Sequence, residues 1–297
     1  MNVLVTGGSG FIGRNIVKVL KEKGNEVGSL DIKEKNSVAD YHITCDIRNR
    51  HMVEKALKGI DQVFHLAAIT SPPEFGNLMA DGYDVNVLGT YNILAGSQVN
   101  KVQRVVIASS SSVYGNSSRM TSEGELPKVY ENFYPLTKRI NEMTAELFED
   151  YNLEVVTLRY FNTYGADENS KGAYSSVIWK FLEYIRNNKK PVIYGDGKQS
   201  RDFVYVKDAA IGSALAMDKG EPAEAYNIGS GHSTDFNTIF EIVKRETGYQ
   251  GEAEYVKNPF KSYQQFTLAD LSKSKRVLNY TPQYDIRTGI RETLESI

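Results

Sequence analysis

The chain of 297 residues is poor in the residue types that build disulfide and metal sites. Its single cysteine, Cys45, excludes an internal disulfide framework and a multi-cysteine metal site, and it fits a reducing compartment. The four histidines lack the spacing of metal ligands, and His65 fits a position packed behind a buried strand better than a ligand position. We therefore expect neither disulfide bonds nor a bound metal.

Charge and hydropathy exclude two further classes of protein. The 35 lysines and arginines nearly balance the 37 aspartates and glutamates, so the net charge is only −2. No basic surplus is available to bind nucleic acid or an anionic membrane. No apolar run approaches the roughly 20 residues that span a bilayer, and no charged leader precedes the first apolar run, MNVLVTGG. We expect a soluble cytoplasmic protein with no nucleic-acid or membrane partner.

Short β-branched runs alternate with helix-like segments in the first half of the chain. The pattern predicts helices at residues 11–23, 50–57, 83–99 and 134–151, and strands at residues 2–6, 26–31, 41–45, 62–66, 104–109 and 154–160. Strands that alternate with helices pair in parallel, and runs such as VVIA lack the alternating polarity of half-exposed strands. The fold class predicted is α/β, a Rossmann-type doubly wound parallel sheet.

The pattern changes after Tyr164. Residues 165–172 (GADENSKG) predict a polar loop, and helices are expected at 177–188, 206–219, 234–247, 271–278 and 285–296. We find no repeat, low-complexity tract or linker. The resulting division places residues 1–164, with about 204–228, in the cofactor-binding domain, and residues 165–203 and 229–297 in a smaller α/β substrate-binding cap.

A glycine-rich loop, TGGSGFIG, follows the first expected strand and opens the first expected helix. Glycine lets the backbone turn tightly and approach a pyrophosphate, while the helix N-terminus supplies N–H donors and a partial positive charge. The alternative is a turn that only packs helix on strand, but the acidic residue after the second strand favours dinucleotide binding. The expected cofactor contacts in this loop are Gly7, Gly10, Phe11, Ile12 and Gly13.

Asp31 ends the second expected strand, where a carboxylate accepts hydrogen bonds from both ribose hydroxyls of a dinucleotide. The same carboxylate would repel a 2′-phosphate, so NAD is favoured over NADP; Lys33 and Lys35 leave NADP as the alternative. Residues after the third and fourth strands are further candidates, although small residues there also simply permit close packing. These candidates are Asp46 and Ile47 near the adenine, and Leu66, Ala67 and Ala68 along the cofactor channel.

Tyr134 and Lys138 stand four residues apart at the start of an expected helix, with Pro135 in its first turn, so they share one helix face. A free tyrosine has a pKa of roughly 10 and is a poor base at neutral pH. A neighbouring ammonium and the positive nicotinamide ring would both favour the phenolate, which could remove a proton from a sugar hydroxyl while hydride leaves to NAD. The alternative is two surface residues, and Tyr194 and Lys198 repeat the spacing on a glycine turn.

Taken together, these residues resemble the extended short-chain dehydrogenase/reductase family, and within it the nucleotide-sugar epimerases and dehydratases. The resemblance implies a seven-stranded Rossmann sheet, a cap that binds a nucleotide sugar, bound NAD, and a homodimer formed through helices near 83–99 and 134–151. The matching stretches cover nearly the whole chain and are TGGSGFIG, CDIRN, HLAA, VNVLGTYNIL, SSSSVYG, YPLTK, RYFNTYG, IYGDGKQSRDFVYVKD, YNIGSG and TLADLSKSKRVLNY.

The resemblance also resolves the stretch ASSSSVYG, whose four serines either cap a buried strand or hold a substrate hydroxyl. It implies that the catalytic residues are Ser110, Tyr134 and Lys138, with Ser110 bonding the reacting hydroxyl and helping to pass its proton to Tyr134. It also implies that Ser109 lies along the nicotinamide, that Ser111 touches the sugar, and that Tyr160 contacts the cofactor.

Family dehydratases, and the decarboxylases that resemble them, carry acidic residues just after the catalytic serine or threonine. A dehydratase needs such an acid to protonate a departing hydroxyl. Ser111 and Ser112 occupy those positions here. We therefore expect reversible hydride transfer at one sugar carbon, in which a 4-keto sugar rotates and takes hydride on its other face while NAD stays bound.

The same resemblance places a nucleotide-diphosphate site in the second half of the chain. Asn162 and Arg201 would hold the diphosphate, because a guanidinium suits phosphate geometry, and Tyr194 would stack on the base. The alternatives are an ion pair of Arg201 with Asp202, and ordinary helix packing for the 176–177 segment. The expected substrate contacts are Ser110, Ser111, Asn162, Ser176, Val177, Tyr194, Arg201 and Tyr263.

Two segments depart from the pattern of UDP-hexose 4-epimerases. Phe260 and Lys261 stand where those enzymes carry a diphosphate-binding arginine, and the YQ-x-FT-x-AD run is similar to ADP-heptose 6-epimerases. Those heptose enzymes resemble NADP users, whereas Asp31 favours NAD. The loop from Ser71 onward is also unlike the commoner form.

We expect an NAD-dependent epimerase of a nucleotide sugar, foremost UDP-glucose and UDP-galactose at carbon 4. The alternatives are an epimerase of UDP-N-acetylhexosamine, UDP-uronate or ADP-heptose, and a net oxidoreductase that releases NADH and a keto sugar. A non-catalytic NAD-binding protein is the alternative of a different class.

Overall fold

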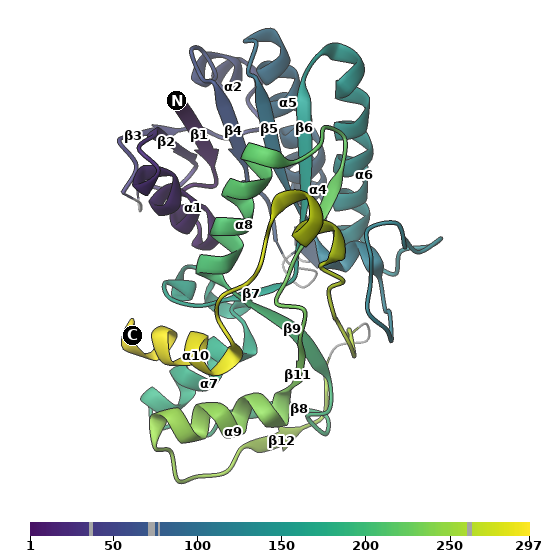
Figure 1. The fold of residues 1–297 in the computed structure, drawn as a ribbon. Coiled ribbons are helices and arrows are strands. Elements are labelled where there is room, and N and C mark those ends of the chain that lie inside the picture. The colour runs from purple at the N-terminus through teal and green to yellow at the C-terminus, as the bar shows by residue number, and fades with distance from the viewer. Residues whose placement is uncertain (36–37, 71–74, 77, 260–262) are drawn as a thin grey trace.

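The computed structural model describes residues 1–35, 38–70, 75–76, 78–259 and 263–297 (Figure 1). Its main element is a parallel sheet of seven strands in the order β3-β2-β1-β4-β5-β6-β10, which confirms the predicted fold class. Strand order reverses between β1 and β4, the place where open α/β sheets bind ligands. The strands are β1 (Asn2–Thr6), β2 (Glu26–Asp31), β3 (Tyr41–Thr44), β4 (Gln62–His65), β5 (Arg104–Ser110), β6 (Glu154–Tyr160) and β10 (Ala225–Ile228).

Helices cover both faces of this sheet, which is why its central strands carry apolar residues on both sides. Val5 of β1 packs in the core beneath α1 and α8, whereas its neighbour Leu4 packs in the core beneath α2, α5 and α6. Successive strand residues point to opposite faces, so each strand must supply apolar side chains to two cores. The helices, which Figure 1 shows as two layers, are α1 (Phe11–Glu22) and α8 (Val206–Lys219), with α2 (Arg50–Ala56), α5 (Thr90–Val99) and α6 (Phe133–Leu147) opposite.

The helix expected at 83–99 starts earlier than predicted. It begins as α4 (Met79–Tyr83), continues through a π-helical segment, Asp84–Gly89, and ends as α5. The segment brings Gly89 so close to Ile47 that a Cβ would lie 2.5 Å from Ile47 Cδ1. The π-helical segment therefore packs closely on Ile47, in the loop that follows β3.

The second half of the chain forms two small sheets, ordered β11-β9-β7 and β12-β8. Figure 1 shows these with three helices at the lower end of the molecule, while α8 and β10 return to the large sheet as the sequence predicts. The elements are β7 (Asn162–Tyr164), α7 (Val177–Arg186), β8 (Val192–Tyr194), β9 (Ser200–Tyr205), β11 (Ser233–Asp235), α9 (Phe236–Thr247), β12 (Glu254–Val256) and α10 (Ile286–Glu295).

Two expectations for the second half are corrected. The predicted polar loop at 165–172 contains a 3-10 segment, Glu168–Tyr174, organised by the buried carboxylate of Glu168, which accepts from Lys171 Nζ at 2.9 Å. The segment around 269–280, assigned to the cap from sequence, packs in the large-sheet core, because a β-bridge joins Ala269 to Thr121. The division into two domains stays an interpretation.

Candidate active site

The glycine-rich loop between β1 and α1 leaves no room for side chains. A Cβ on Gly13 would lie 2.2 Å from the carbonyl oxygen of Gly7, and one on Gly7 would lie 2.8 Å from the backbone nitrogen of Ala67. Gly7 has a φ of +68°, a left-handed conformation that glycine adopts without strain. The backbones of β1, β4 and α1 therefore meet closely at the reversal of strand order, as a pyrophosphate site requires.

The start of α1 is open to an anion. Gly10 precedes the helix and no side chain caps it, so the amide groups of the first turn are left for a ligand. The carboxylate of Asp31 lies beside this loop, because it accepts from the backbone nitrogens of Ser9 and Lys33, both at 3.1 Å. An uncapped helix start with an adjacent carboxylate fits the diphosphate and ribose of NAD.

The other expected cofactor residues lie along the same edge of the sheet. Asp46 is ion-paired with Arg48, with 2.7 Å between Oδ2 and Nη2, and Ile47 is buried. Ala67 N donates to Thr6 Oγ1 at 3.3 Å, which ties the end of β4 to β1. The expected residues at this edge, besides the loop glycines and Asp31, are Phe11, Ile12, Asp46, Ile47, Leu66, Ala67 and Ala68.

Two residues close to this edge have their side chains in the core. His65 is buried, with Nδ1 2.7 Å from Thr6 Oγ1 and Nε2 3.0 Å from Thr90 Oγ1, and burial together with the charge of Lys138 lowers its pKa to about 3. The imidazole is therefore neutral at pH 7. The prediction that His65 packs behind a buried strand is confirmed. The Tyr160 hydroxyl lies 2.6 Å from a serine hydroxyl of α8, so its contact with the cofactor stays a prediction.

α6 presents Tyr134 and Lys138 on one face to the carboxyl end of β5. Both side chains are buried, with exposures of 6% and 5%. Lys138 Nζ donates to the carbonyl oxygen of Ala108 at 2.8 Å. Burial lowers the pKa of Lys138 to about 8, against the opposing effect of Glu142. A lysine with this pKa is mostly cationic at pH 7 and can stabilise a phenolate on Tyr134.

β5 ends at Ser110, and the following residues form the 3-10 segment Ser111–Tyr114. Ser110 Oγ accepts from Ser112 N at 3.1 Å and so caps this segment at the edge of the sheet that faces α6. The hydroxyl of Ser109 donates to Glu142 Oε1 at 2.5 Å. Ser111 is buried. The strand-cap role and the substrate role considered for the serines are thus compatible, since a capping oxygen keeps a free O–H.

Arg201 of β9 is a buried cation, with 5% exposure. It donates to the carbonyl oxygens of Ser200, at 2.8 Å, and Gln264, and lies over the rings of Phe236 and Tyr263, 5.6 Å and 5.2 Å from their centroids. Burial lowers its pKa to about 10, so it remains cationic at neutral pH. Within the described residues it forms no ion pair, which leaves its charge for an anionic ligand.

The ion pair considered between Arg201 and Asp202 does not form. The carboxylate of Asp202 points away and accepts from the backbone nitrogens of Ser230 at 2.7 Å, Gly231 at 3.0 Å and Ala269 at 3.0 Å. Adjacent side chains of β9 therefore have different partners: Asp202 binds the loop after β10, and Arg201 binds carbonyl oxygens and aromatic rings, with no carboxylate partner among the described residues.

Asn162 and Tyr194 lie on strands close to Arg201. Asn162 begins β7, which pairs with β9, and its Oδ1 accepts from Thr267 Oγ1 at 3.4 Å. Tyr194 ends β8, and its carbonyl oxygen accepts from Gln199 Nε2 at 2.8 Å. Asn162 thus lies on the strand paired with that of Arg201, whereas Tyr194 lies in the other small sheet, and the roles of both residues stay predictions.

Local contacts favour two of the alternatives considered from sequence. Ser176 caps α7, accepting from Trp179 N at 3.2 Å and donating to Glu168 Oε2 at 2.8 Å, while Val177 packs against the cap core. Both fit helix packing. Lys198, of the second Tyr–Lys spacing, is 81% exposed, so it has no buried tyrosine to activate.

Ser71, Phe260 and Lys261 lie outside the described residues. Within the described ranges, no group of three or more His, Cys, Asp or Glu side chains could hold a metal ion. No described helix has the length and apolar character needed to cross a membrane.

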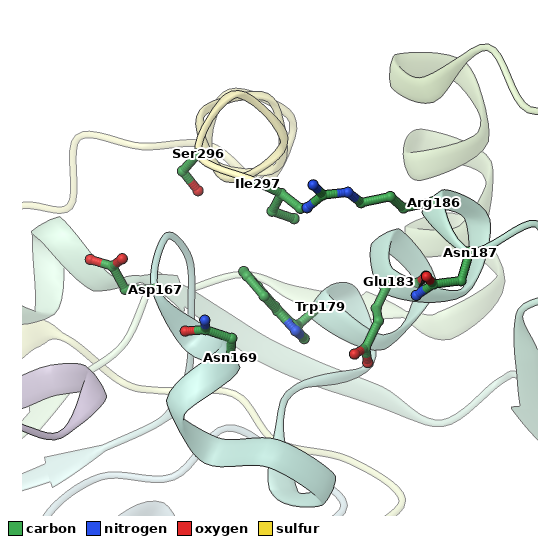
Figure 2. A pocket seen from close by; sticks show the side chains of 8 residues that line it. All are labelled: Asp167, Asn169, Trp179, Glu183, Arg186, Asn187, Ser296 and Ile297. Carbon is green, nitrogen blue, oxygen red and sulfur yellow. Dashed lines mark hydrogen bonds between the residues drawn. The ribbon is translucent and has the colours of Figure 1, made fainter.

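A cavity of about 410 Å³ lies away from the catalytic edge, between α7 and the end of α10 (Figure 2). Figure 2 shows the ring of Trp179 across it, with Arg186 and Ile297 on one side. None of the expected site residues lines this cavity, so the active site is identified by its side chains rather than by this opening. The lining residues are Asp167, Asn169, Trp179, Glu183, Arg186, Asn187, Ser296 and Ile297.

The model of the NAD dependent epimerase/dehydratase family matches residues 3–229. A Methanocaldococcus jannaschii protein, provisionally assigned as a UDP-glucose 4-epimerase, is 36% identical over 98% of this chain and 97% of its own. The chain belongs to the NAD dependent epimerase/dehydratase family. The crystal structure of Thermotoga maritima UDP-glucose 4-epimerase with UDP-glucose is similar with a TM-score of 0.94 and 32% identity, covering 100% of this chain and 98% of that one. An Alkalilimnicola ehrlichii ADP-L-glycero-D-manno-heptose-6-epimerase is 30% identical over 99% of this chain and 97% of its own.

Membership of this NAD-dependent family confirms the resemblance drawn from the motifs and makes NAD the cofactor. The structure adds two buried residues that the sequence analysis did not single out, Glu142 and Arg159, which form an ion pair of 2.8 Å next to Ser109. One sequence signal was available, since Glu142 stands four residues after Lys138 on the same helix face. Nothing in the sequence indicated its partner on β6.

Gly13→Ala is expected to weaken NAD binding by about 10- to 100-fold, because its Cβ would collide with backbone and force the loop to shift. Binding is measured as the NAD content of purified protein and by fluorescence titration. The matched control is Gly124→Ala, whose Cβ would meet nothing within 4 Å and which should bind NAD normally. Wild-type affinity in Gly13→Ala would show that the close packing is not needed.

Proposed function

We propose that the protein is an NAD-dependent epimerase that interconverts UDP-glucose and UDP-galactose by inverting carbon 4. The proposal is carried by the packing of α6 on the end of β5. This packing seats Lys138 against the carbonyl oxygen of Ala108, two residues before Ser110 ends the strand, and Tyr134 is buried one helical turn before Lys138, which supports the proposal. Similarity to Thermotoga maritima UDP-glucose 4-epimerase over the whole chain supports the choice of substrate.

In the proposed reaction, Ser110 holds the 4-hydroxyl of the sugar by a hydrogen bond and Tyr134, as phenolate, takes its proton. Lys138 remains cationic and favours the phenolate. NAD, which the loop of Gly7 to Gly13 and Asp31 would hold, would supply the hydride acceptor for carbon 4 and the hydride donor to its opposite face. Between these steps the keto sugar turns over in the pocket. Tyr134 then gives its proton back to the sugar oxygen, so the chain ends each turnover unchanged.

Epimerisation is favoured over loss of water because no acid follows Ser110. Ser111 and Ser112 occupy the positions after it and cannot protonate a departing hydroxyl. The carboxylate beside this strand end, Glu142, is paired with Arg159 at 2.8 Å and serves as an acceptor. The observed side chains thus support proton removal but not acid-assisted elimination.

Arg201, together with Asn162, is proposed to bind the diphosphate, and Tyr194 and Tyr263 to contact the base. A buried guanidinium without a carboxylate partner is costly unless a ligand compensates its charge. An anionic diphosphate supplies this compensation and accepts two parallel N–H bonds. A bound diphosphate would supply the negative charge that no described residue provides to Arg201.

Epimerisation of ADP-heptose is the second candidate, because the Alkalilimnicola ehrlichii heptose epimerase is 30% identical and the YQ-x-FT-x-AD run is similar to such enzymes. UDP-N-acetylhexosamine or UDP-uronate would use the same catalytic residues. A net oxidoreductase would consume external NAD, and a non-catalytic NAD-binding protein would leave the catalytic residues without a role.

The cytoplasmic location stays a prediction from the sequence.

We further propose a homodimer formed through α5 and α6. Both helices carry exposed apolar side chains, and exposed apolar patches mark interaction surfaces. The family resemblance implies a partner subunit at these helices. The patch comprises the large apolar side chains that are at least 46% exposed on these helices and the segments next to them, namely Leu88, Tyr91, Val99, Phe133, Met143, Leu147 and Tyr151.

Purified protein without added cofactor is expected to convert UDP-glucose to UDP-galactose and back, because its own NAD is regenerated in each turnover. Proton NMR of the anomeric signals measures the conversion. The N-acetyl forms, UDP-glucuronate and ADP-heptose are tested in parallel, and their relative rates rank the sugars. Conversion of ADP-heptose alone would select the second candidate.

The matched control for this assay is Tyr134→Phe, which removes only the hydroxyl. It should lose about 10²- to 10⁴-fold in turnover, the usual loss on removing a general base, and should retain its NAD. Normal turnover in Tyr134→Phe would remove this residue from the mechanism and overturn the proposal.

Arg201→Gln is expected to raise the KM for the nucleotide sugar about 10- to 100-fold, because charged hydrogen bonds to the diphosphate are lost, with NAD content unchanged. The KM is measured by steady-state kinetics in a coupled assay. Lys198→Gln, an exposed cation three residues earlier, should leave KM unchanged. An equal loss of NAD content would indicate misfolding instead and contradict the assignment.

Met143→Glu with Leu147→Glu is expected to convert a dimer into a monomer, since two charges would be buried on each side of the interface. Light scattering after size-exclusion chromatography measures the mass. Val129→Glu, which changes an equally apolar residue that is 79% exposed outside the patch, should remain dimeric. A monomeric wild-type protein at micromolar concentration would refute the dimer.

A further inference from the structure

Tyr134, Lys138 and Glu142 follow one another at intervals of four residues and share the face of α6 that packs on β5. Lys138 Nζ donates to the carbonyl oxygen of Ala108 at 2.8 Å, and Glu142 Oε1 accepts from Ser109 Oγ at 2.5 Å. Successive turns of the helix thus hold successive residues of the strand, immediately before the strand reaches its catalytic serine.

The carboxylate of Glu142 is itself fixed from two further directions. Arg159 of β6 donates from Nε to Oε1 at 2.9 Å and from Nη2 to Oε2 at 2.8 Å, and Arg139 donates from Nη1 to Oε2 at 3.1 Å. Arg159 lies opposite Ser109 in the register of β5 and β6. With 2% of Glu142 exposed, this network joins α6 to the ends of two neighbouring strands.

We infer that Glu142 is a positioning residue for the catalytic set. It holds Ser109 and thereby directs the adjacent Ser110 toward Tyr134, and its charge keeps Lys138 protonated. This inference rests on the proposed roles of these three catalytic residues. It assigns a purpose to a buried ion pair that would otherwise only stabilise the fold.

Glu142 lies one helical turn after Lys138 on the same face of α6, so its charge acts on the buried ammonium. Burial lowers the pKa of Lys138 to about 8, and the charge of Glu142 acts in the opposite direction. The neutral His65 of β4 also faces this lysine, while Arg139 and Arg159 both bond to Glu142. Removing the negative charge therefore lowers the pKa of Lys138 further, and the ammonium is lost at a lower pH.

Glu142→Gln is expected to lower kcat at least tenfold with little change in KM. In the kcat–pH profile of this variant, the fall in kcat at high pH should begin about one pH unit lower than in the wild type. This is the size of effect expected when a nearby opposite charge is removed. A second readout needs no substrate: proton–carbon NMR titration of protein labelled with [13Cε]lysine, with the Lys138 signal assigned by Lys138→Arg. The pKa of Lys138 should fall by about one unit as well.

Two variants separate the effects. Glu146→Gln, on the same helix and also bonded to Arg139 at 3.1 Å, is the control and should leave both the pH limb and the Lys138 titration unchanged. Ser109→Ala removes the hydrogen bond but keeps the charge, so it should lower kcat several-fold at unchanged NAD content and leave the pH limb in place.

The inference fails if Glu142→Gln shows the wild-type pH limb and the wild-type Lys138 titration, or if Ser109→Ala turns over normally. Should Glu142→Gln not fold, Ser109→Ala alone decides, and unchanged kcat would overturn the positioning role. Failure of the proposed function is distinguished by Tyr134→Phe: normal turnover there removes the mechanism, whereas the NMR titration still reports whether Glu142 sets the charge of Lys138.

Discussion

The contact between α6 and the carboxyl end of β5 is the constraint on which the active site depends. The tyrosine and lysine that we propose as catalytic lie on the helix, and the proposed serine ends the strand, so the proposed site needs both elements. A buried ammonium that donates to a strand carbonyl, Lys138 to Ala108, fixes their relative position. Because an unsatisfied buried charge is costly, this hydrogen bond resists sliding of the helix along the sheet.

The cofactor half of the site depends on close packing of the backbone rather than on a hydrogen bond between side chain and strand. Gly7 and Gly13 bring β1, β4 and α1 together without intervening side chains, and Asp31 is oriented by the loop it faces. Since all these strands are parallel, their carboxyl ends meet at one edge, which places the cofactor loop beside the end of β5. One topology thus brings the expected NAD-binding loop and the proposed proton acceptor, Tyr134, to the same edge of the sheet.

The cap contributes charge rather than catalysis. Arg201 is buried among aromatic rings and carbonyl oxygens, while the neighbouring Asp202 is turned to the loop after β10. This separation keeps a guanidinium available without a competing carboxylate. Residues around 269–280 then pack in the core of the large sheet, so the chain returns to that sheet after forming the small ones.

The sequence by itself determined the fold class, the positions of six strands of the large sheet and the family, because these depend on apolar periodicity and on short motifs whose spacing is visible along the chain. It also placed Tyr134 and Lys138 on one helix face, a local property of α-helices. It did not reveal that Glu142 binds Arg159, that Arg201 has no ion pair among the described residues, or that Ser176 caps α7. Those are contacts between segments distant in the chain or choices between competing partners, and only tertiary packing decides which partner each buried polar group obtains.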